Sequence, residues 1–313
     1  MSDYVFLRRD ADTVSEQVFE VFTYPMGETT VRVKPGAELL PGTQILRVNT
    51  ASPDWVVVAA WAAACENRFP DQRRVLVIPF LPSARGDKDT PCPAAINAEL
   101  ASAAPITDLV TIDPHSPVWL DLYTAAAFGV TVHEIDTSRV TFSALAVNAI
   151  NEEVLVHTGG LNFDGPDGMG YTAVISPDAG ARDRASAMAD ILKLPVLVAE
   201  KKRDPATGRI LSYDFPAALD GGRVLVVDDI CDGGGTFAML ANALPGSVEA
   251  DLWVTHGGFT KGWKGTGLER YHTIFTTDSL PSAVKLWMEH PERNRVAMTY
   301  LDPFINEIIA GLK

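Results

Sequence analysis

The sequence predicts an α/β fold built on mostly parallel sheet. Short runs rich in Val, Ile and Leu recur along the 313-residue chain without alternating with polar residues. Such runs are typical of strands that helices cover on both faces. Helix-like stretches such as 94–104 and 182–192 separate the runs, which is the alternation of α/β proteins. The predicted strands are Arg74–Phe80, Asp108–Ile112, Tyr171–Ser176, Pro195–Ala199, Arg223–Val227 and Ala250–Val254.

The most apolar stretch of the chain, Trp55–Cys65, predicts a buried helix. It has about half the length that a membrane span needs, so we expect no membrane association. The three cysteines, Cys65, Cys92 and Cys231, form no C-x-x-C pair, and their odd number argues against a disulfide framework. Free cysteines are typical of the reducing cytoplasm, where we expect the protein to reside.

Charge and length set further bounds. The chain carries 26 basic and 40 acidic residues, for a net charge of −14. This balance argues against binding to a nucleic-acid backbone but permits a local basic site for a small anion.

The length of the chain allows two domains. The earlier predicted strands end before about residue 140, so we predict domains 1–140 and 141–313, with the last helix packing back on the first domain.

Polar and charged side chains follow each predicted strand. Ligands of open parallel sheets bind outside the carboxyl ends of the strands, so these residues predict a shared functional site. Any one of them alone would be an ordinary polar strand end. The segments are Leu81–Lys88, Asp113–His115, Pro177–Gly180, Glu200–Arg203, Asp228–Asp229 and Thr255–Gly257.

The strongest local signal is a glycine turn that follows the strand ending at Val227. Two carboxylates, Asp228 and Asp229, precede the turn Asp232–Thr236, and a helix is predicted over Phe237–Leu244. The glycines allow backbone N–H groups to converge on an anion at the helix N-terminus. Thr236 is predicted to cap the helix or donate to a phosphate oxygen. Because the carboxylates suit sugar hydroxyls, the segment predicts a sugar phosphate site.

Other interpretations of the same turn remain open. The simplest is a glycine-rich connection between a strand and a helix, without a ligand. The spacing of Gly233, Gly235 and Ala238 also fits a dinucleotide loop, G-x-G-x-x-A. That fingerprint expects an acid about 20 residues later, whereas here the relevant acids precede the glycines. The chain has no G-x-x-x-x-G-K-[S/T] segment, so a P-loop is not supported.

The acid–glycine arrangement resembles the binding motif of type I phosphoribosyltransferases and of ribose-phosphate pyrophosphokinases. Five further segments are similar to the pyrophosphokinases and occur in the same order. The resemblance implies two phosphoribosyltransferase-like domains, each a mostly parallel sheet flanked by helices. The segments are Tyr24–Val33, similar to the adenine-binding stretch, then Pro82–Lys88, Asp113–His115, Ser176–Gly180 and Thr255–Gly257.

The resemblance implies a Mg²⁺-dependent transfer of the pyrophosphoryl group of ATP to the C1 hydroxyl of ribose 5-phosphate, giving AMP and phosphoribosyl pyrophosphate. Lys201 and Arg203 match the catalytic cations, in a polar stretch, 200–209, that suits a mobile lid loop. His115 and Asp178, with Asp113 nearby, match residues that hold Mg²⁺ or its water. The implied ribose phosphate ligands are Asp178, Asp228, Asp229, Asp232, Gly233, Gly234, Gly235 and Thr236.

The implied ATP contacts lie in the first domain. Tyr24 would stack on adenine, and Glu28 would accept a hydrogen bond from its amine. In this family the adenine stretch reaches into the site of a neighbouring subunit, which implies a homo-oligomer. Taken alone, Tyr24 would be interpreted as a core or edge aromatic. The remaining ATP contacts implied are Arg85, Asp87, Lys88 and His115.

The sequence departs from the family pattern at both substrate sites. Gly233 replaces a threonine of the phosphate loop, while Met26, Ser83 and Gly86 replace polar residues near ATP. A less hydroxylated loop suggests a larger 5′-phosphate ester, ADP-ribose, as the acceptor, in a step of NAD biosynthesis. Two other hypotheses are a non-catalytic regulatory relative, and a phosphoribosyltransferase that consumes the diphosphate. Retention of Lys201 argues against the first, and chain length argues against the second.

Overall fold

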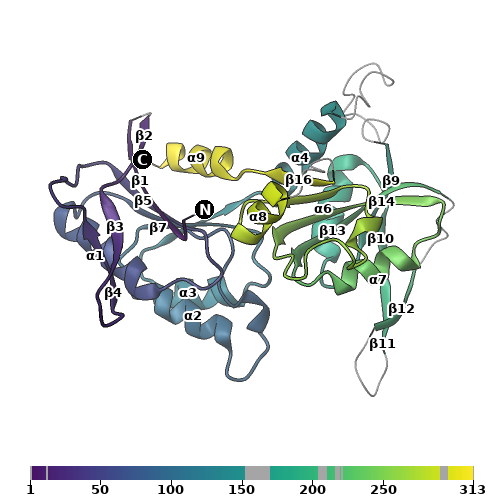
Figure 1. The fold of residues 1–313 in the computed structure, drawn as a ribbon, viewed down its shortest axis with the longest axis horizontal. Coiled ribbons are helices and arrows are strands. Elements are labelled where there is room, and N and C mark those ends of the chain that lie inside the picture. The colour runs from purple at the N-terminus through teal and green to yellow at the C-terminus, as the bar shows by residue number, and fades with distance from the viewer. Residues whose placement is uncertain are drawn as a thin grey trace. The chain divides into compact units, whose positions relative to one another are not determined.

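The computed structural model describes residues 2–11, 13–151, 170–203, 210–215, 219, 221–289 and 295–312. The chain forms two compact units (Figure 1). The first contains Met1–Ile135 and Asp302–Lys313, and the second contains Asp136–Leu301. The last helix therefore belongs to the first unit.

The first unit has a six-stranded sheet in the order β2-β1-β5-β6-β7-β8. Strands β5 to β8 run parallel to one another, and β1 pairs antiparallel with both β2 and β5. The strands are β1 (Tyr4–Asp10), β2 (Thr13–Glu16), β5 (Thr43–Val48), β6 (Arg74–Val77), β7 (Asp108–Ile112) and β8 (Thr131–Ile135).

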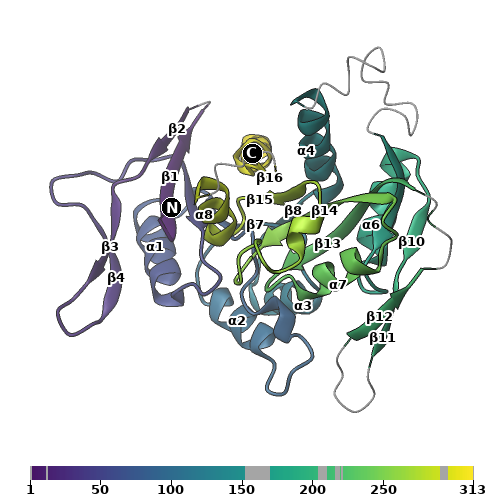
Figure 2. The ribbon, with the colours of Figure 1, turned by 45° about the vertical axis from the view of Figure 1, so that its right-hand side comes forward.

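A buried helix and a separate ribbon complete the core of this unit. Helix α1 (Trp55–Arg68) begins at Asp54, whose carboxylate accepts a hydrogen bond from the Val56 N–H. Val57, Trp61 and Cys65 are buried, which confirms the predicted buried helix. Ribbon β3–β4 contacts α1 (Figure 2). The other elements of this unit are β3 (Phe19–Thr23), β4 (Thr29–Val33), η1 (Ala84–Gly86), α2 (Pro93–Ser102), α3 (Val118–Ala126) and α9 (Asp302–Gly311).

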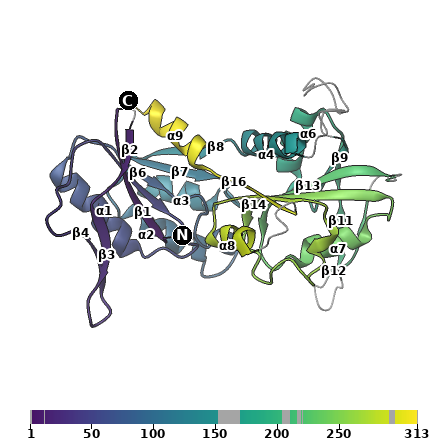
Figure 3. The same ribbon diagram turned by 45° about the horizontal axis from the view of Figure 1, so that its top comes forward.

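The second unit has a sheet in the order β10-β9-β13-β14-β15-β16, in which all paired neighbours run parallel. These parallel strands confirm the predicted α/β class. Helices α4 and α6 cover one face of the sheet, and α7 and α8 cover the other (Figure 3). The strands are β9 (Tyr171–Ser176), β10 (Val196–Val198), β13 (Gly222–Cys231), β14 (Val248–Gly257), β15 (Ile274–Thr277) and β16 (Val296–Thr299).

A two-stranded ribbon, β11–β12, continues from β10 and passes α7 (Figure 1). Over the described residues, no helix has the length and apolar character needed to cross a membrane. The remaining elements of this unit are α4 (Thr137–Asn151), α6 (Arg182–Leu192), β11 (Glu200–Arg203), β12 (Ile210–Asp214), α7 (Gly235–Ala243), η3 (Leu268–Arg270) and α8 (Pro281–Glu289).

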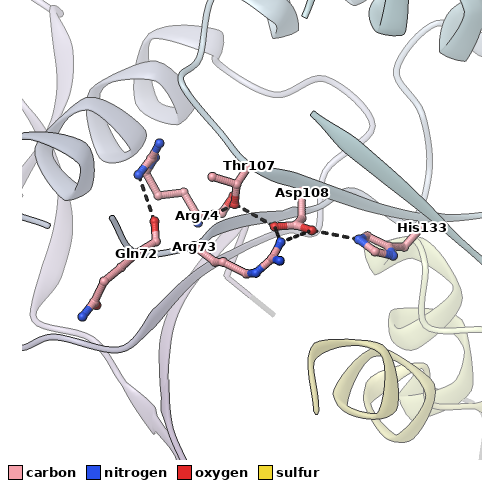
Figure 4. A network of polar contacts seen from close by, with 6 residues as sticks. All are labelled: Gln72, Arg73, Arg74, Thr107, Asp108 and His133. Atoms are coloured by element: carbon pink, nitrogen blue, oxygen red, sulfur yellow. Dashed lines mark hydrogen bonds and ion pairs between the residues drawn. The ribbon is translucent and has the colours of Figure 1, made fainter. Parts of the chain in front are cut away.

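A buried carboxylate holds the amino ends of the strands in the first unit. Asp108, at the start of β7, is fully buried and accepts hydrogen bonds from three side chains (Figure 4). The donors are Arg73 Nη1 at 3.0 Å, Thr107 Oγ1 at 2.7 Å and His133 Nε2 at 2.9 Å. Burial alone would raise the pKa of Asp108, but these bonds outweigh it and lower that pKa.

The second unit contains a similar arrangement. Asp251 on β14 is also fully buried, and Arg223 Nε lies 2.7 Å from its Oδ2. Its carboxylate accepts hydrogen bonds from the Tyr171 hydroxyl and from the Thr273 N–H. Here burial outweighs the partners and raises the pKa of Asp251. Each sheet is thus cross-linked near its amino edge by an Asp–Arg pair.

Replacing Asp108 by asparagine is expected to destabilise the protein by about 1–3 kcal/mol at pH 7, because charged hydrogen bonds are lost. A carboxylate with a lowered folded pKa stabilises the fold above its unfolded pKa of about 3.9, and this contribution disappears as pH falls through the folded value. The Tm of Asp108→Asn should therefore fall less between pH 5 and pH 3 than that of the unsubstituted protein. Asp121→Asn, at an exposed acid on α3, is the control. Identical pH profiles for all three proteins would contradict this role.

Candidate functional site

The site in the second unit lies where the order of the strands reverses. The chain runs from β9 to β10 on one side of β9, and later returns to β13 on the other side. In open α/β sheets ligands bind at this kind of switch point, outside the carboxyl ends of the strands. Asp178 follows β9, and Asp228 and Asp229 lie near the carboxyl end of β13. The topology therefore brings three of the predicted site residues to one place.

Asp228 and Asp229 form a closely coupled acid pair. The strand continues through them to Cys231 rather than ending at Val227 as predicted, because pairing with β14 persists. Asp229 is 3% exposed, and Arg184 Nη2 of α6 lies 3.4 Å from its Oδ2. Burial, and then the charge of Asp229, raise the pKa of Asp228 to about 8. A hydroxyl donor or a cation bound by the pair would relieve this repulsion.

Asp178 organises the turn between β9 and α6. Its Oδ1 accepts hydrogen bonds from the N–H groups of Gly180, at 2.8 Å, and Ala181, at 3.2 Å. Its Oδ2 pairs with the Lys201 ammonium. Burial alone would raise the pKa of Asp178, but Lys201 and the N–H donors outweigh it and lower that pKa. The negative charge of Asp178 in turn contributes to the raised pKa of Asp228.

Lys201 lies on a regular strand, which corrects the prediction of a loop over 200–209. Residues Glu200–Arg203 form β11, and 204–209 lie outside the described residues. Strand pairing explains the difference, because Lys201 lies opposite Tyr213 of β12. The Tyr213 hydroxyl donates to the carbonyl oxygen of Thr236 at 3.3 Å. The ribbon thus contacts the site through Asp178 and through the first turn of α7. Arg203 is the last residue of β11.

The glycine turn leads directly into α7. Gly234 occupies the N-cap position with φ +76°, in the left-handed region that favours glycine. A Cβ at Gly234 would lie 2.8 Å from Leu268 Cδ1, so neither the backbone nor the space suits a side chain. Thr236 is the second helical residue and makes no capping bond, so the predicted helix cap is wrong and Gly234 takes that place. The turn presents the N–H groups of a helix N-terminus.

Gly234→Ala is expected to lower the free energy of unfolding by about 1–3 kcal/mol, because the added methyl group is strained by both φ and Leu268. Gly235→Ala is the matched control, since a Cβ there meets no atom within 4 Å and φ is not positive. Urea unfolding monitored by tryptophan fluorescence measures the difference. Equal losses in the two variants would disprove the steric requirement at Gly234.

Two basic residues of this region were not predicted as part of the site. Arg184 reaches Asp229 from α6, and the stem of Lys261 lies against Gly233. Asp232 accepts a 2.7 Å hydrogen bond from the Thr260 hydroxyl, which ties the glycine turn to the loop after β14. Both basic residues follow carboxyl ends of strands, and that position is the signal that could have identified them.

The first unit presents a second group of predicted site residues, after the adjacent strands β6 and β7. Ser83 and Asp113 have φ of +57° and +46°, which is unusual for residues with a side chain. Strained backbone of this kind clusters at functional sites. Close packing explains why a glycine stands at position 86, because a Cβ there would lie 2.9 Å from Pro93 Cδ. Of the predicted ATP ligands in these loops, Arg85, Lys88 and His115 are exposed, and Asp87 is half-buried.

Tyr24 and Glu28 lie in the turn of ribbon β3–β4, where the Tyr24 N–H donates to the Glu28 carbonyl at 2.8 Å. The Tyr24 ring meets Phe22 edge to face, with the ring centroids 4.9 Å apart. Tyr24 is 49% exposed, and Met26 is 93% exposed. The turn therefore offers an apolar, aromatic surface, and Tyr24 is not a core aromatic.

The described residues contain no group of three His, Cys, Asp or Glu side chains that could by itself hold a metal ion. Mg²⁺ commonly uses one or two carboxylates together with water and substrate phosphates, so such a group is not a requirement for it. The Asp228–Asp229 pair fits this kind of site, because it offers two neighbouring carboxylates, of which Asp229 is buried and Asp228 half-buried, and a cation would relieve their mutual repulsion.

Comparison with known proteins agrees with this geometry. A model of the phosphoribosyl transferase domain matches residues 159–247, which contain the acids and the glycine turn. The phosphoribosylpyrophosphate synthetase of Mycobacterium smegmatis has a similar fold, with a TM-score of 0.67 and 17% identity over 94% of this chain and 90% of that one. The fold and the acid–glycine site thus define a protein of the phosphoribosyltransferase fold, and the predicted pair of phosphoribosyltransferase-like domains is confirmed.

The particular family follows from sequence relatives. The ribose-phosphate pyrophosphokinase of Maricaulis maris is 28% identical over 68% of this chain, and that of Hyphomonas neptunium is 26% identical over 77%. These relatives agree with the resemblance to ribose-phosphate pyrophosphokinases that the motifs predicted. The chain spans 63% of the length of the Maricaulis maris protein and 71% of the length of the Hyphomonas neptunium protein.

Proposed function

We propose that the protein transfers the pyrophosphoryl group of ATP to the C1 hydroxyl of ribose 5-phosphate. The observation that supports this most is the acid pair Asp228–Asp229 beside the glycine turn, at the switch point of a parallel sheet. The pair suits the vicinal hydroxyls of a pentose, and the N–H groups of the turn suit its 5′-phosphate. The curated relatives bear the name of this reaction.

In the proposed reaction the C1 oxygen attacks the β-phosphorus of ATP. The bond from that phosphorus to the α–β bridging oxygen breaks, AMP leaves, and the hydroxyl proton is released. Such transfers depend on positioning and on neutralising charge more than on a protein nucleophile. Lys201 is the proposed cation at the transferring group, together with Arg203. In the present structure Lys201 pairs with Asp178, so catalysis requires that this ion pair separate.

Mg²⁺ is the proposed cofactor, and when bound it would neutralise charge on the phosphates. Asp228 and Asp229 are the residues whose environment best fits a cation or its water, with Asp178 next to them. Asp113 and His115 remain the proposed metal contacts on the ATP side. ATP is the proposed donor, with Arg85, Asp87 and Lys88 as phosphate contacts and with Tyr24 and Glu28 as adenine contacts. The exposed turn at Tyr24 also suits the proposed homo-oligomer, in which it would enter a neighbouring subunit.

ADP-ribose is a second candidate acceptor, and Gly233 favours it. Gly233 has no side chain to close the phosphate end of the turn, and its φ is not in the restricted positive range. A larger 5′-phosphate ester is favoured by a turn that has no side chain at this position, where the neighbouring group is the flexible stem of Lys261. The same chemistry would then give ADP-ribose pyrophosphate, for use in NAD biosynthesis.

The test is AMP formation by the purified protein from ATP and Mg²⁺, with ribose 5-phosphate and ADP-ribose as separate acceptors. AMP that depends on either acceptor supports the proposal, and the ratio of kcat/KM identifies the preferred one. Absence of AMP with both acceptors would refute the enzyme assignment and favour a regulatory relative. Pyrophosphate release from phosphoribosyl pyrophosphate and a free base would instead indicate a phosphoribosyltransferase.

A further inference from the structure

The loop after β14, residues 258–262, is tied to the glycine turn by its backbone. The N–H groups of Gly258 and Phe259 donate to the carbonyl oxygen of Cys231 at 2.8 and 3.0 Å, and the Thr260 N–H donates to that of Asp232 at 3.0 Å. Together with the bond between the Thr260 and Asp232 side chains, these contacts fix the loop against the start of the turn.

Backbone strain also marks this loop. Phe259 has φ of +43°, a conformation that is an outlier for a bulky residue. Phe259 is 5% exposed and packs in the core of the unit. Strain of this kind persists only where the surroundings determine the conformation, and it is concentrated at functional sites. The buried ring and the hydrogen bonds to Cys231 and Asp232 therefore determine the path of the chain at Lys261, two residues later.

The stem of Lys261 lies directly over Gly233. A Cβ at Gly233 would lie 3.4 Å from both Cδ and Cε of Lys261, which is van der Waals contact. The residue itself is exposed, so its ammonium group remains available at the rim of the glycine turn. The glycine and the lysine are complementary, because a β-branched residue at 233 would place its γ-atoms against the lysine stem.

A phosphate bound at the glycine turn needs a positively charged side chain from another segment. A phosphate placed there lies close to the acidic residues Asp228, Asp229 and Asp232, while Arg184 pairs with Asp229 and Lys201 pairs with Asp178. The N–H groups of a helix N-terminus offer only partial charge. An ammonium group adjacent to Gly233 supplies a full unit of opposite charge to the phosphate.

We propose that Lys261 binds the anionic end of the acceptor and takes the place of the loop hydroxyl that glycine at 233 lacks. This assignment rests on the proposed function, because it places a sugar phosphate in the turn. The ligand chemistry is a phosphate oxygen, which belongs either to the 5′-phosphate itself or to the second phosphate of a diphosphate ester.

The test compares Lys261→Met with Lys264→Met, which removes a second positive charge three residues further along the chain, where Lys264 lies over the Trp263 ring. We expect Lys261→Met to raise the KM for the acceptor about 10- to 100-fold, with little change in kcat or in the KM for ATP. Lys264→Met should leave all three constants unchanged, and Lys261→Arg should restore most of the affinity. Calorimetric titration of ribose 5-phosphate and of ADP-ribose measures binding independently of turnover.

An effect on both acceptors places the ammonium at the 5′-phosphate, and an effect on ADP-ribose alone places it at the second phosphate. If the protein forms AMP but Lys261→Met leaves acceptor KM and binding unchanged, the assignment of Lys261 fails while the proposed function stands. If Lys264→Met has an equal effect, the charge acts nonspecifically and the assignment also fails. If neither acceptor binds and no AMP forms, both the assignment and the proposed function fail.

Discussion

Lys201→Ala is expected to lower kcat for AMP formation about 100- to 1,000-fold, the usual cost of removing one preorganised group that stabilises developing charge. The Lys201 side chain is 12% exposed and its ammonium pairs with Asp178, so it is close to the acids before any ligand binds. Since its proposed contact forms with the transferring group, the KM for the acceptor should change much less than kcat. Initial rates of AMP release with each substrate varied in turn measure the two constants.

Lys202→Ala is the matched control for this prediction. Lys202 is the next residue of the same strand, its side chain is 64% exposed, and it pairs with Asp214 rather than with Asp178. Adjacent side chains of a strand point to opposite faces, so this variant removes the same charge without touching the acids. Lys201→Arg should recover part of kcat. An unchanged kcat in Lys201→Ala, or an equal loss in Lys202→Ala, would contradict the catalytic role of Lys201.

Asp228→Asn is expected to raise the Tm of the ligand-free protein by several degrees near pH 8, and at the same time to lower kcat/KM for the acceptor. The folded pKa of Asp228, about 8, lies far above its unfolded value of about 4. The unfolded chain therefore loses this proton first, and the group destabilises the fold progressively as pH rises from about 4 to 8. Asparagine does not ionise and so removes this pH-dependent destabilisation. The gain in Tm should therefore be small at pH 4 and greatest near pH 8.

Thermal unfolding of the ligand-free protein from pH 4 to pH 8.5 tests the stability effect. Asp190→Asn, at an exposed acid on α6, is the control and should leave the Tm unchanged. In the unsubstituted protein, kcat/KM for the acceptor should rise with pH towards about 8, as the acid pair loses its shared proton. A Tm difference that does not grow with pH would show that ionisation of Asp228 does not destabilise the fold.

The parallel core could be predicted from the sequence because its strands are covered on both faces. Strands β7 and β9 begin and end where their apolar runs do. Strands β13 and β14 extend beyond those runs, through Cys231 and Gly257, since polar residues can continue a parallel ladder when neighbouring strands supply the hydrogen bonds. Strands β1 and β2 were not predicted, because their antiparallel pairing leaves them mostly half-buried or exposed and without an apolar run.

The acids and glycines of the site were predictable because their chemistry is local in the sequence. Asp228, Asp229 and Gly234 follow one another along a single strand and turn. The contribution of Lys261 depends instead on a loop that is folded back over Gly233 by hydrogen bonds to Cys231 and Asp232. Such contacts come from tertiary structure, and periodicity or spacing does not encode them. For the same reason the pairing of Lys201 with Tyr213 replaced a predicted loop by a strand.

The pairs Arg73–Asp108 and Arg223–Asp251, in which the acid is fully buried, lie at the edge of each sheet opposite to the predicted ligand loops. These Asp–Arg pairs therefore stabilise each sheet at the end of its strands that lies away from the predicted ligand loops. Transplanting the segments that follow β9, β13 and β14 from a relative with another acceptor should give chimeras that still fold. The architecture thus allows new specificities to evolve without a redesign of the scaffold.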